Sequence, residues 1–142
     1  MQLIDVLELR VRYSETDQLG TFYNSRALEW FECGRTELMR KLGLPYTDTE
    51  SKGVYLPLVE SHVEYLGRAR YDDLLIVASG WELFRRASMR FETNIRHASG
   101  GAPVVRGYTI HAFTDLTGKA IRPPAWLIEA MAKLPKSPSD NS

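Results

Sequence analysis

The residues of this sequence that could do chemistry lie in one short stretch, 13–24, which reads Tyr-Ser-Glu-Thr-Asp-Gln-Leu-Gly-Thr-Phe-Tyr-Asn. It places the carboxylate of Asp17 close to a glycine, Gly20, and leads into a run with helical periodicity. A carboxylate just before a helix lies near free backbone N–H groups and the positive end of the helix dipole, which can hold an anion. A carboxylate facing an oxyanion site is the minimum equipment for hydrolysing an acyl compound. We therefore take Asp17 as the candidate catalytic residue and expect Glu15 to be a solvated loop residue.

Metal ligands and other nucleophiles are scarce in the sequence. Cys33 is the only cysteine, which excludes an internal disulfide and a cysteine-rich metal site, and no base lies near it in the sequence. We expect Cys33 to be a small packing residue within a helix. The three histidines, His62, His97 and His111, are not spaced as metal ligands. We therefore predict no metal and no cofactor, and expect His62 to be a hydrogen-bonded surface residue and the other two to be structural.

The composition indicates one soluble domain. The chain has 142 residues, with 18 Lys plus Arg and 18 Asp plus Glu, so its formal net charge is zero. This balance argues against a protein that binds nucleic acid through bulk charge. The first residues lack a basic region and a long apolar run, and no stretch approaches the ~18 apolar residues of a membrane span. We expect a cytoplasmic protein without a signal peptide or membrane segment.

The candidate loop is followed by an unusually apolar helix. The helix is expected to begin after Asn24 or Ser25 as N-cap and to end near Leu42, because a glycine and a proline follow. Its apolar stripe covers more than half of the circumference, so the helix should be wrapped by other elements. Gly34 lies in the middle of this helix, where glycine costs about 1 kcal/mol against alanine, and it should permit close approach to a sheet.

The remaining elements are almost all strands. Alternation predicts strands over 3–13, 54–66, 74–84, 87–96 and 103–114, with 74–84 in the centre because both of its faces are apolar. A polar linker is expected over 47–53, a last short strand over 120–122 and a second helix over 125–134. Strands joined by short turns predict a mainly antiparallel sheet and an α+β domain over 1–134. Residues 135–142 are expected to form a disordered tail.

Two motifs in this order resemble a known family. The first is the stretch Arg12 to Asn24 followed by Trp30-Phe31-Glu32 and Arg35, and the second is Ala69-Arg70-Tyr71-Asp72-Asp73 before a long apolar strand. Together they resemble the active-site signature of the 4-hydroxybenzoyl-CoA thioesterase family, over roughly residues 5 to 132. The resemblance implies the hotdog fold, in which a curved antiparallel sheet wraps a long helix. It also implies a dimer with two shared active sites, often doubled to a tetramer.

The same resemblance implies roles for individual residues in hydrolysing an acyl-CoA. Asp17 would act as general base on water or as nucleophile on the thioester carbonyl. Backbone N–H groups at the helix start, around Tyr23 and Asn24, would hold the oxyanion, with Gly20 in the loop before them. Tyr13 and Tyr23 would be pocket walls. The coenzyme A phosphates would contact basic residues at two further positions, Arg85 and Arg86.

Two departures from the family pattern keep alternatives open. Many relatives carry a histidine or tyrosine in place of Asn24, and asparagine cannot move a proton near neutral pH. The turn before Tyr71 usually has a proline where this chain has Arg68. A thioesterase acting on acyl carrier protein and a non-catalytic acyl-CoA binding module are therefore alternatives, whereas a hotdog dehydratase is disfavoured because no histidine closely follows Asp17. The acyl group, aromatic or short to medium chain, stays open.

Overall fold

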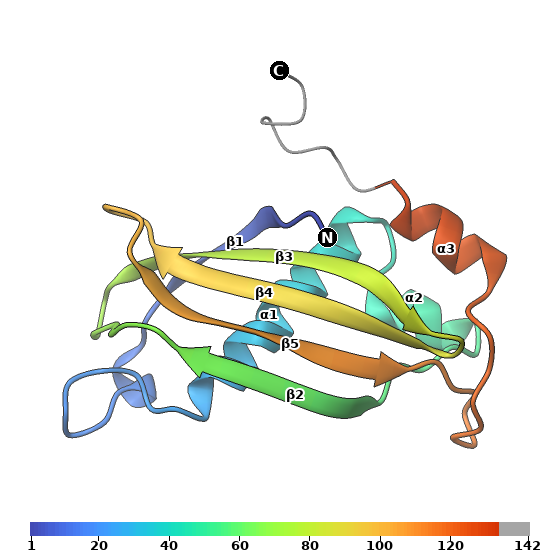
Figure 1. Ribbon diagram of the computed structural model, residues 1–142, viewed down its shortest axis with the longest axis horizontal. Coiled ribbons are helices and arrows are strands. Elements are labelled where there is room, and N and C mark those ends of the chain that lie inside the picture. Colours follow the sequence, from blue (N-terminus) through green and yellow to red (C-terminus); the bar gives the residue numbers. More distant parts are fainter. Residues whose placement is uncertain (134–142) are drawn as a thin grey trace.

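The fold is a curved antiparallel sheet with one long helix across one face, as Figure 1 shows for the computed structural model, which describes residues 1–133. The strand order is β1-β3-β4-β5-β2, and every neighbouring pair is antiparallel. The strands are β1 (Ile4–Arg10), β2 (Leu58–Tyr65), β3 (Leu74–Arg85), β4 (Ser88–His97) and β5 (Pro103–Ala112). The helices are α1 (Arg26–Lys41), α2 (Tyr46–Ser51), α3 (Ala125–Met131) and a short 3₁₀ turn, η1 (Tyr13–Glu15). This is the hotdog architecture that the sequence predicts.

Helix α1 packs its apolar stripe against the sheet. Trp30, Phe31 and Leu38 are almost completely buried there, and each such side chain contributes roughly 2 kcal/mol of burial energy. Gly34 lies at the closest approach, where a Cβ atom would come within 2.9 Å of Cγ1 of Val77 on β3. The close contact predicted for this glycine is therefore confirmed.

Strand β3 is central, as predicted, because it pairs with β1 on one side and β4 on the other. Its apolar residues meet α1 on one face, where Leu75 and Val77 are fully buried. The neighbouring strand β4 alternates as its sequence predicts, with Met89, Phe91 and Ile95 buried toward the helix. These two strands form the floor of the core.

Strand β2 is an edge strand, which pairs only with β5. Its residues are exposed or half-buried throughout, including Leu58, Val59 and Tyr65. The alternation in 54–66 therefore reflects a strand with its inner face only partly covered, because α1 does not reach the whole length of this edge (Figure 1). The outer edge of β2 therefore pairs with no other strand in residues 1–133.

Four expectations need correction or fall outside the structure. The polar segment expected as a linker over 47–53 contains helix α2, in which Thr49 is buried and its hydroxyl donates to the Tyr46 carbonyl. The strand expected over 120–122 is reduced to one bridge between Thr114 and Ala120. Cys33 is exposed and is not a packing residue. The tail predicted over 135–142 lies outside the described residues.

Candidate active site

The two motifs lie side by side at one end of the sheet. The amide of Val11 donates to the carbonyl of Asp73 at 3.0 Å, and the amide of Phe22 donates to the carbonyl of Ala69 at 2.9 Å. The hydroxyl of Thr21 bonds both the amide and the carbonyl of Ala69, at 3.1 and 3.2 Å. Segments that are some fifty residues apart in the chain are therefore joined into one support for the Asp17 loop. We call this part of the molecule, formed by residues 11–22 and 69–73, the loop end of the sheet.

The turn in the second motif is built by its own aspartates. Asp73 accepts the Arg70 amide on Oδ2 at 2.8 Å, and Asp72 adopts a left-handed backbone with φ of 71°. The ring of His97 contacts the Arg68 carbonyl at 2.8 Å through Nε2. These aspartates shape the turn, and the prediction that His97 is structural is confirmed.

Asp17 is held by the loop in which it lies. Its Oδ1 accepts the Leu19 amide at 2.8 Å, its amide donates to the Thr21 carbonyl at 2.9 Å, and its carbonyl accepts the Gly20 amide at 3.0 Å. Gly20 has φ of 79°, which explains the glycine at this point of the turn. Oδ2 of the half-buried Asp17 accepts no hydrogen bond from residues 1–133, so the loop orients the carboxylate while leaving one oxygen available.

At the start of α1, one of the backbone N–H groups expected to hold an oxyanion is already engaged. The Tyr23 amide donates to the Glu15 carbonyl at 2.7 Å, so it is already engaged and cannot also hold an oxyanion. The amides of Arg26 and Ala27 are engaged with carbonyls of Tyr23 and Asn24. Within the described part of the chain the amides of Asn24 and the N-cap residue, Ser25, donate no hydrogen bond. The Tyr23 amide is therefore engaged, and an oxyanion role for the N–H groups at the helix start stays a prediction.

The two tyrosines named as pocket walls are exposed in the single chain. Tyr13 is 78% exposed, and its ring packs edge to face against Tyr71 with the centroids 5.8 Å apart. Tyr23 is 52% exposed. A third tyrosine, Tyr65 at the end of β2, donates its hydroxyl to the Asn24 carbonyl at 2.8 Å, which ties the edge strand to the helix start. The pocket role of Tyr13 and Tyr23 stays a prediction.

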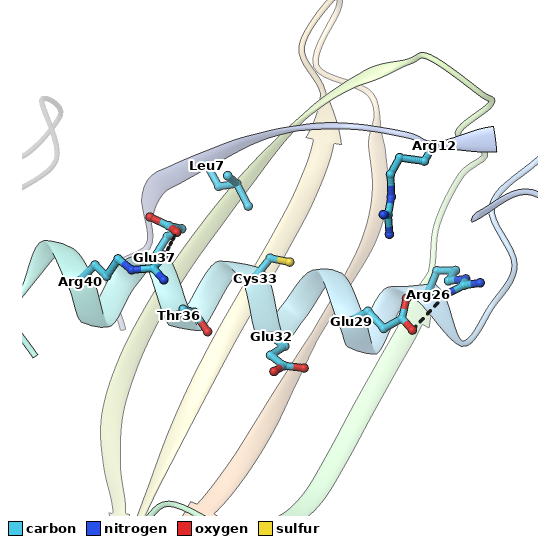
Figure 2. A pocket seen from close by; sticks show the side chains of 9 residues that line it. All are labelled: Leu7, Arg12, Arg26, Glu29, Glu32, Cys33, Thr36, Glu37 and Arg40. Carbon is cyan, nitrogen blue, oxygen red and sulfur yellow. Dashed lines mark hydrogen bonds and ion pairs between the residues drawn. The ribbon is translucent and has the colours of Figure 1, made fainter. Parts of the chain in front are cut away.

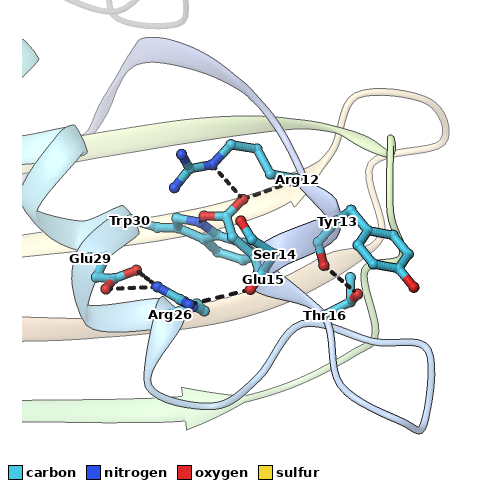
Figure 3. Close-up of polar contacts among 8 residues, drawn as sticks. All are labelled: Arg12, Tyr13, Ser14, Glu15, Thr16, Arg26, Glu29 and Trp30. Carbon is cyan, nitrogen blue, oxygen red and sulfur yellow. Dashed lines mark hydrogen bonds and ion pairs between the residues drawn. The ribbon is translucent and has the colours of Figure 1, made fainter.

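Glu15 was expected to be a solvated loop residue, and this prediction is wrong. It is only 4% exposed, with Oε1 accepting the Arg12 amide at 2.8 Å and Oε2 accepting the indole N–H of Trp30 at 2.7 Å (Figure 3). Burial raises the pKa of this carboxyl, but the hydrogen bonds from Arg12 and Trp30 outweigh burial and hold the pKa below its ordinary value. Glu15 is thus a buried, charged anchor and not a solvated loop residue. A signal was present in Trp30, since an indole buried on a helix needs an acceptor for its N–H.

A family model described as the thioesterase-like superfamily matches residues 11–131, most of the chain and both motifs. The chain belongs to this superfamily. YneP of Bacillus subtilis (strain 168), provisionally named an acyl-CoA thioesterase, is 43% identical over 70 residues, which are 49% of this chain and 51% of YneP. Acyl-CoA thioesterase YbgC of Haemophilus influenzae is 32% identical over 88 residues, or 61% of this chain and 65% of YbgC. The chain thus spans about half to two thirds of the length of these relatives.

A solved structure agrees with this assignment. DHNA-CoA thioesterase from Staphylococcus aureus is 29% identical, with a TM-score of 0.79 over 90% of this chain and 88% of that chain. The predicted kinship with the 4-hydroxybenzoyl-CoA thioesterase family is confirmed at the level of the superfamily, and the relatives' names support the predicted enzyme class, a thioester hydrolase.

The basic pair of this superfamily member lies far from Asp17. Arg85 ends β3 and lies over the ring of Phe84, 4.9 Å from its centroid, and Arg86 with Arg122 lines a hollow of about 280 Å³. Strand β3 has 12 residues and spans roughly 36 Å, with the Asp17 loop at one end and Arg85 at the other (Figure 1). We call this second region, which carries Arg85, Arg86 and Arg122, the hairpin end. Within one chain, Arg85 and Arg86 do not share a site with Asp17.

A larger hollow lies away from the Asp17 loop. It measures about 490 Å³ and lies between α1 and β1, lined by nine residues that include Arg12, Arg26, Glu32, Cys33 and Arg40 (Figure 2). Although Cys33 is exposed, partial desolvation within the hollow and the neighbouring Glu32 carboxylate raise the pKa of its thiol, so the thiolate is disfavoured. Asp17 is not among the lining residues. This hollow therefore does not include the candidate catalytic residue.

The described residues contain no group of three or more histidine, cysteine or acidic side chains arranged to hold a metal ion. His62 is exposed and contacts Glu64 at 3.2 Å, and His111 is buried between the Leu56 carbonyl and the Thr109 hydroxyl. Both therefore lie as predicted, one on the surface and one inside. Over residues 1–133, each helix is too short or too polar to cross a bilayer.

Proposed function

We propose that this chain hydrolyses an acyl-CoA thioester to a free acid and coenzyme A, with Asp17 as the catalytic carboxylate. One observation supports this most strongly: the loop fixes Oδ1 of Asp17 and leaves Oδ2 without a partner in residues 1–133, while the amides of Asn24 and Ser25 are free at the helix start. Membership of the thioesterase-like superfamily supports the same reaction. An oriented base near free N–H groups is the arrangement that acyl transfer to water requires.

In the reaction, Oδ2 of Asp17 accepts a proton from a water molecule as the water oxygen attacks the thioester carbonyl carbon. The carbonyl oxygen becomes an oxyanion, which the Asn24 and Ser25 amides stabilise. The oxyanion then collapses, the carbon–sulfur bond breaks and coenzyme A leaves as a thiolate, which takes up the proton. Because a thiolate is a good leaving group, no separate acid is needed, and the asparagine at position 24 is compatible with catalysis.

The decisive test compares the wild type with Asp17→Asn on a panel of acyl-CoA thioesters, following thiol release. The substitution keeps the size of the side chain and removes its base, so kcat should fall at least ~10²-fold. Asp48→Asn is the matched control, since Asp48 is exposed on α2, and it should keep wild-type activity. Full activity in Asp17→Asn would remove Asp17 from the mechanism. Binding without hydrolysis by the wild type would favour the non-catalytic binding module.

The alternative in which Asp17 attacks the carbonyl directly forms an acyl-aspartyl anhydride and expels the thiolate, and water then cleaves the anhydride. A single turnover in ¹⁸O-labelled water separates the two routes. General-base catalysis transfers the label only to the released acid. Nucleophilic catalysis, with water attacking the Asp17 side of the anhydride, leaves the label on Asp17 itself, where mass spectrometry of the loop peptide detects it.

A second copy of the chain is part of this proposal. The outer edge of β2 pairs with no strand in the described chain, and it carries exposed apolar side chains such as Val59, which is 62% exposed. Antiparallel pairing of β2 with its copy about a two-fold axis would turn the partner's hairpin end toward this chain's loop end. Arg85 and Arg86 could then reach the phosphates of a substrate held at Asp17. Sedimentation of Val59→Lys should show monomer where the wild type shows dimer or tetramer, and unchanged association would exclude this edge.

The same basic hairpin end favours one second candidate substrate. Arg86 and Arg122 line one hollow, Arg85 is next to Arg86 in the chain, and the three would also suit the acidic surface of an acyl carrier protein. Hydrolysis of one acyl group presented on coenzyme A and on carrier protein separates the two. A higher kcat/KM for the coenzyme A thioester supports our proposal, and a higher value for the carrier-protein thioester replaces it.

A further inference from the structure

Glu15 lies at the base of the Asp17 loop. Its backbone carbonyl accepts the Tyr23 amide at 2.7 Å, and the next pair inward, Thr16 and Phe22, forms an antiparallel bridge. The loop between them is short, so its two ends meet at Glu15. Any movement of Glu15 therefore moves the segment that holds Asp17.

The side chain of the same residue is fixed to helix α1. Oε2 accepts the indole N–H of Trp30, which lies in the second turn of the helix, and Oε1 accepts the amide of Arg12, which precedes the loop. The Arg12 Nε also lies 3.5 Å from Oε1 (Figure 3). A second link runs in parallel, because Arg26 in the first helical turn donates to the Ser14 carbonyl at 3.2 Å. The Glu15 side chain thus joins the loop directly to the helix that presents the oxyanion donors.

We propose that Glu15 is a positioning residue for hydrolysis, which fixes the Asp17 loop against the start of α1 through its buried carboxylate. The inference rests on the proposed function for its kinetic consequence. The geometry requires an acceptor at both oxygens, since the Arg12 amide and the Trp30 indole are both donors. A carboxylate satisfies both, whereas glutamine must turn its NH₂ group toward one of them. A donor facing a donor in a buried place costs a hydrogen bond and forces the loop to shift.

The first variant is Glu15→Gln, assayed with the best substrate of the acyl-CoA panel. Glu15 is only 4% exposed, so its effect on the reaction would pass through the position of Asp17. Because a misplacement of about 1 Å reduces catalysis up to 10²-fold, kcat should fall about 10- to 100-fold. KM should change less than about threefold, since ground-state binding does not depend on the base. A wild-type kcat in folded Glu15→Gln, or a change confined to KM, would overturn the proposal.

The second variant tests the hydrogen bond itself. Trp30→Phe removes the indole N–H and keeps an aromatic ring against Phe22, whose centroid lies 4.8 Å from that of Trp30. Combined with Glu15→Gln, it removes the donor that the new amide opposes. The double variant should be at least about fivefold more active than the product of the two single effects predicts. Effects that simply multiply would contradict the proposed contact.

Stability must be separated from positioning. Leu127→Ala is the matched control, because Leu127 is fully buried on α3, which lies at the other end of the sheet from the Asp17 loop (Figure 1). It should lower Tm as much as Glu15→Gln or more, yet keep kcat at a temperature below both transitions. An equal loss of kcat in Leu127→Ala would reduce Glu15 to a purely structural role. If Glu15→Gln does not fold, Trp30→Phe alone decides, and a wild-type kcat in that variant overturns the proposal.

Amide hydrogen exchange tests the anchoring without any substrate. The amides of Asp17, Gly20 and Tyr23 are hydrogen-bonded within the loop, and they should exchange at least about tenfold faster in Glu15→Gln. Unchanged exchange refutes the anchoring whatever the enzyme hydrolyses. Faster exchange in a protein that cleaves no acyl-CoA leaves the anchoring intact and rejects the proposed function instead.

Discussion

The loop end and the hairpin end of the sheet are built in different ways. At the loop end, backbone hydrogen bonds join Val11 to Asp73 and Phe22 to Ala69, and the buried Glu15 carboxylate ties the loop to α1. At the hairpin end, Arg85 lies over the ring of its neighbour Phe84, and Arg86 borders an open hollow. The first arrangement orients the Asp17 carboxylate through hydrogen bonds within its loop. The second leaves long cationic side chains free to follow a polyanion.

Under the proposed function, this difference divides catalysis and phosphate recognition between the two ends. Catalysis depends on the exact placement of a base and of N–H groups, so it needs a rigid support. Recognition of phosphates depends on charge and on adaptable geometry, so it tolerates mobile arginines. Changes at the loop end should therefore appear in kcat, and changes at the hairpin end should appear in KM.

The largest expected effect concerns stability against acid, and it arises from His111 in the part of β5 nearest the hairpin end. Burial lowers the pKa of this ring to about 4, opposed by its bond to the Leu56 carbonyl, and the nearby Arg35 lowers it further. Because the unfolded chain binds this proton first, stability is complete above pH 6.5 and falls as the pH drops toward 4. The total loss is roughly 3 kcal/mol.

Denaturant unfolding of wild type and His111→Gln at several pH values measures this loss. Glutamine can keep both hydrogen bonds but does not titrate, so the stability difference between the two proteins should shrink or reverse between pH 6.5 and 4. At the loop end, Glu15 has a lowered pKa, so its contribution is present above its ordinary value of 4.5 and is lost only below that pH. Parallel curves for the two proteins from pH 6.5 to 4 would show that the ring does not carry the effect.

A smaller effect is expected from Thr21→Val at the loop end. The substitution keeps the shape of the side chain but leaves the Ala69 amide without the hydroxyl that accepts it, which costs about 1–3 kcal/mol. Because Thr21 also accepts the Asp17 amide through its carbonyl, kcat should fall about tenfold with little change in KM. Thr117→Val, in the exposed hairpin loop after β5, is the control and should leave kcat unchanged. A change in KM alone would place Thr21 outside the support of Asp17.

The sequence correctly predicted the elements whose pattern lies within one short segment of the chain. Strand β3 was predicted over 74–84 because both faces are apolar, and the structure has it over Leu74–Arg85. The glycine at 34 was read as a close contact, and its helix and strand partners are where the pattern predicts. Helix α2 was missed because its sequence, Tyr-Thr-Asp-Thr-Glu-Ser, is polar and too short to show a period.

The site was less accessible to sequence reasoning because its contacts are not local. Glu15 was expected in solvent, since an acid in a loop usually lies there, and its partner Trp30 is 15 residues further along the chain. The hydrogen bond from the Tyr23 amide to the Glu15 carbonyl depends on the three-dimensional path of the loop, so the sequence alone does not reveal it. The separation of Arg85 from Asp17 follows from the length of β3, and no spacing in the sequence reveals it. The catalytic role of Asp17 itself stays a prediction.

The smallest expected effect belongs to the hairpin end, and it tests most directly whether the two ends affect different kinetic constants. The double variant Arg85→Ala/Arg86→Ala removes the two proposed phosphate contacts but leaves the loop untouched. KM for the best acyl-CoA should rise about tenfold, equivalent to about 1.4 kcal/mol, while kcat stays within about twofold. Arg40→Ala, an exposed arginine paired with Glu37 on α1, is the control and should change neither constant.

A shortened substrate decides whether the lost contacts are to phosphate. An acyl-pantetheine thioester lacks the nucleotide phosphates, so its KM should be the same for the wild type and for Arg85→Ala/Arg86→Ala. Added salt should raise the wild-type KM for acyl-CoA toward that of the double variant, because the interaction is between charges. A fall in kcat with both substrates would mean that the hairpin end supports the catalytic geometry, and the separation between the two ends of the sheet would then be wrong.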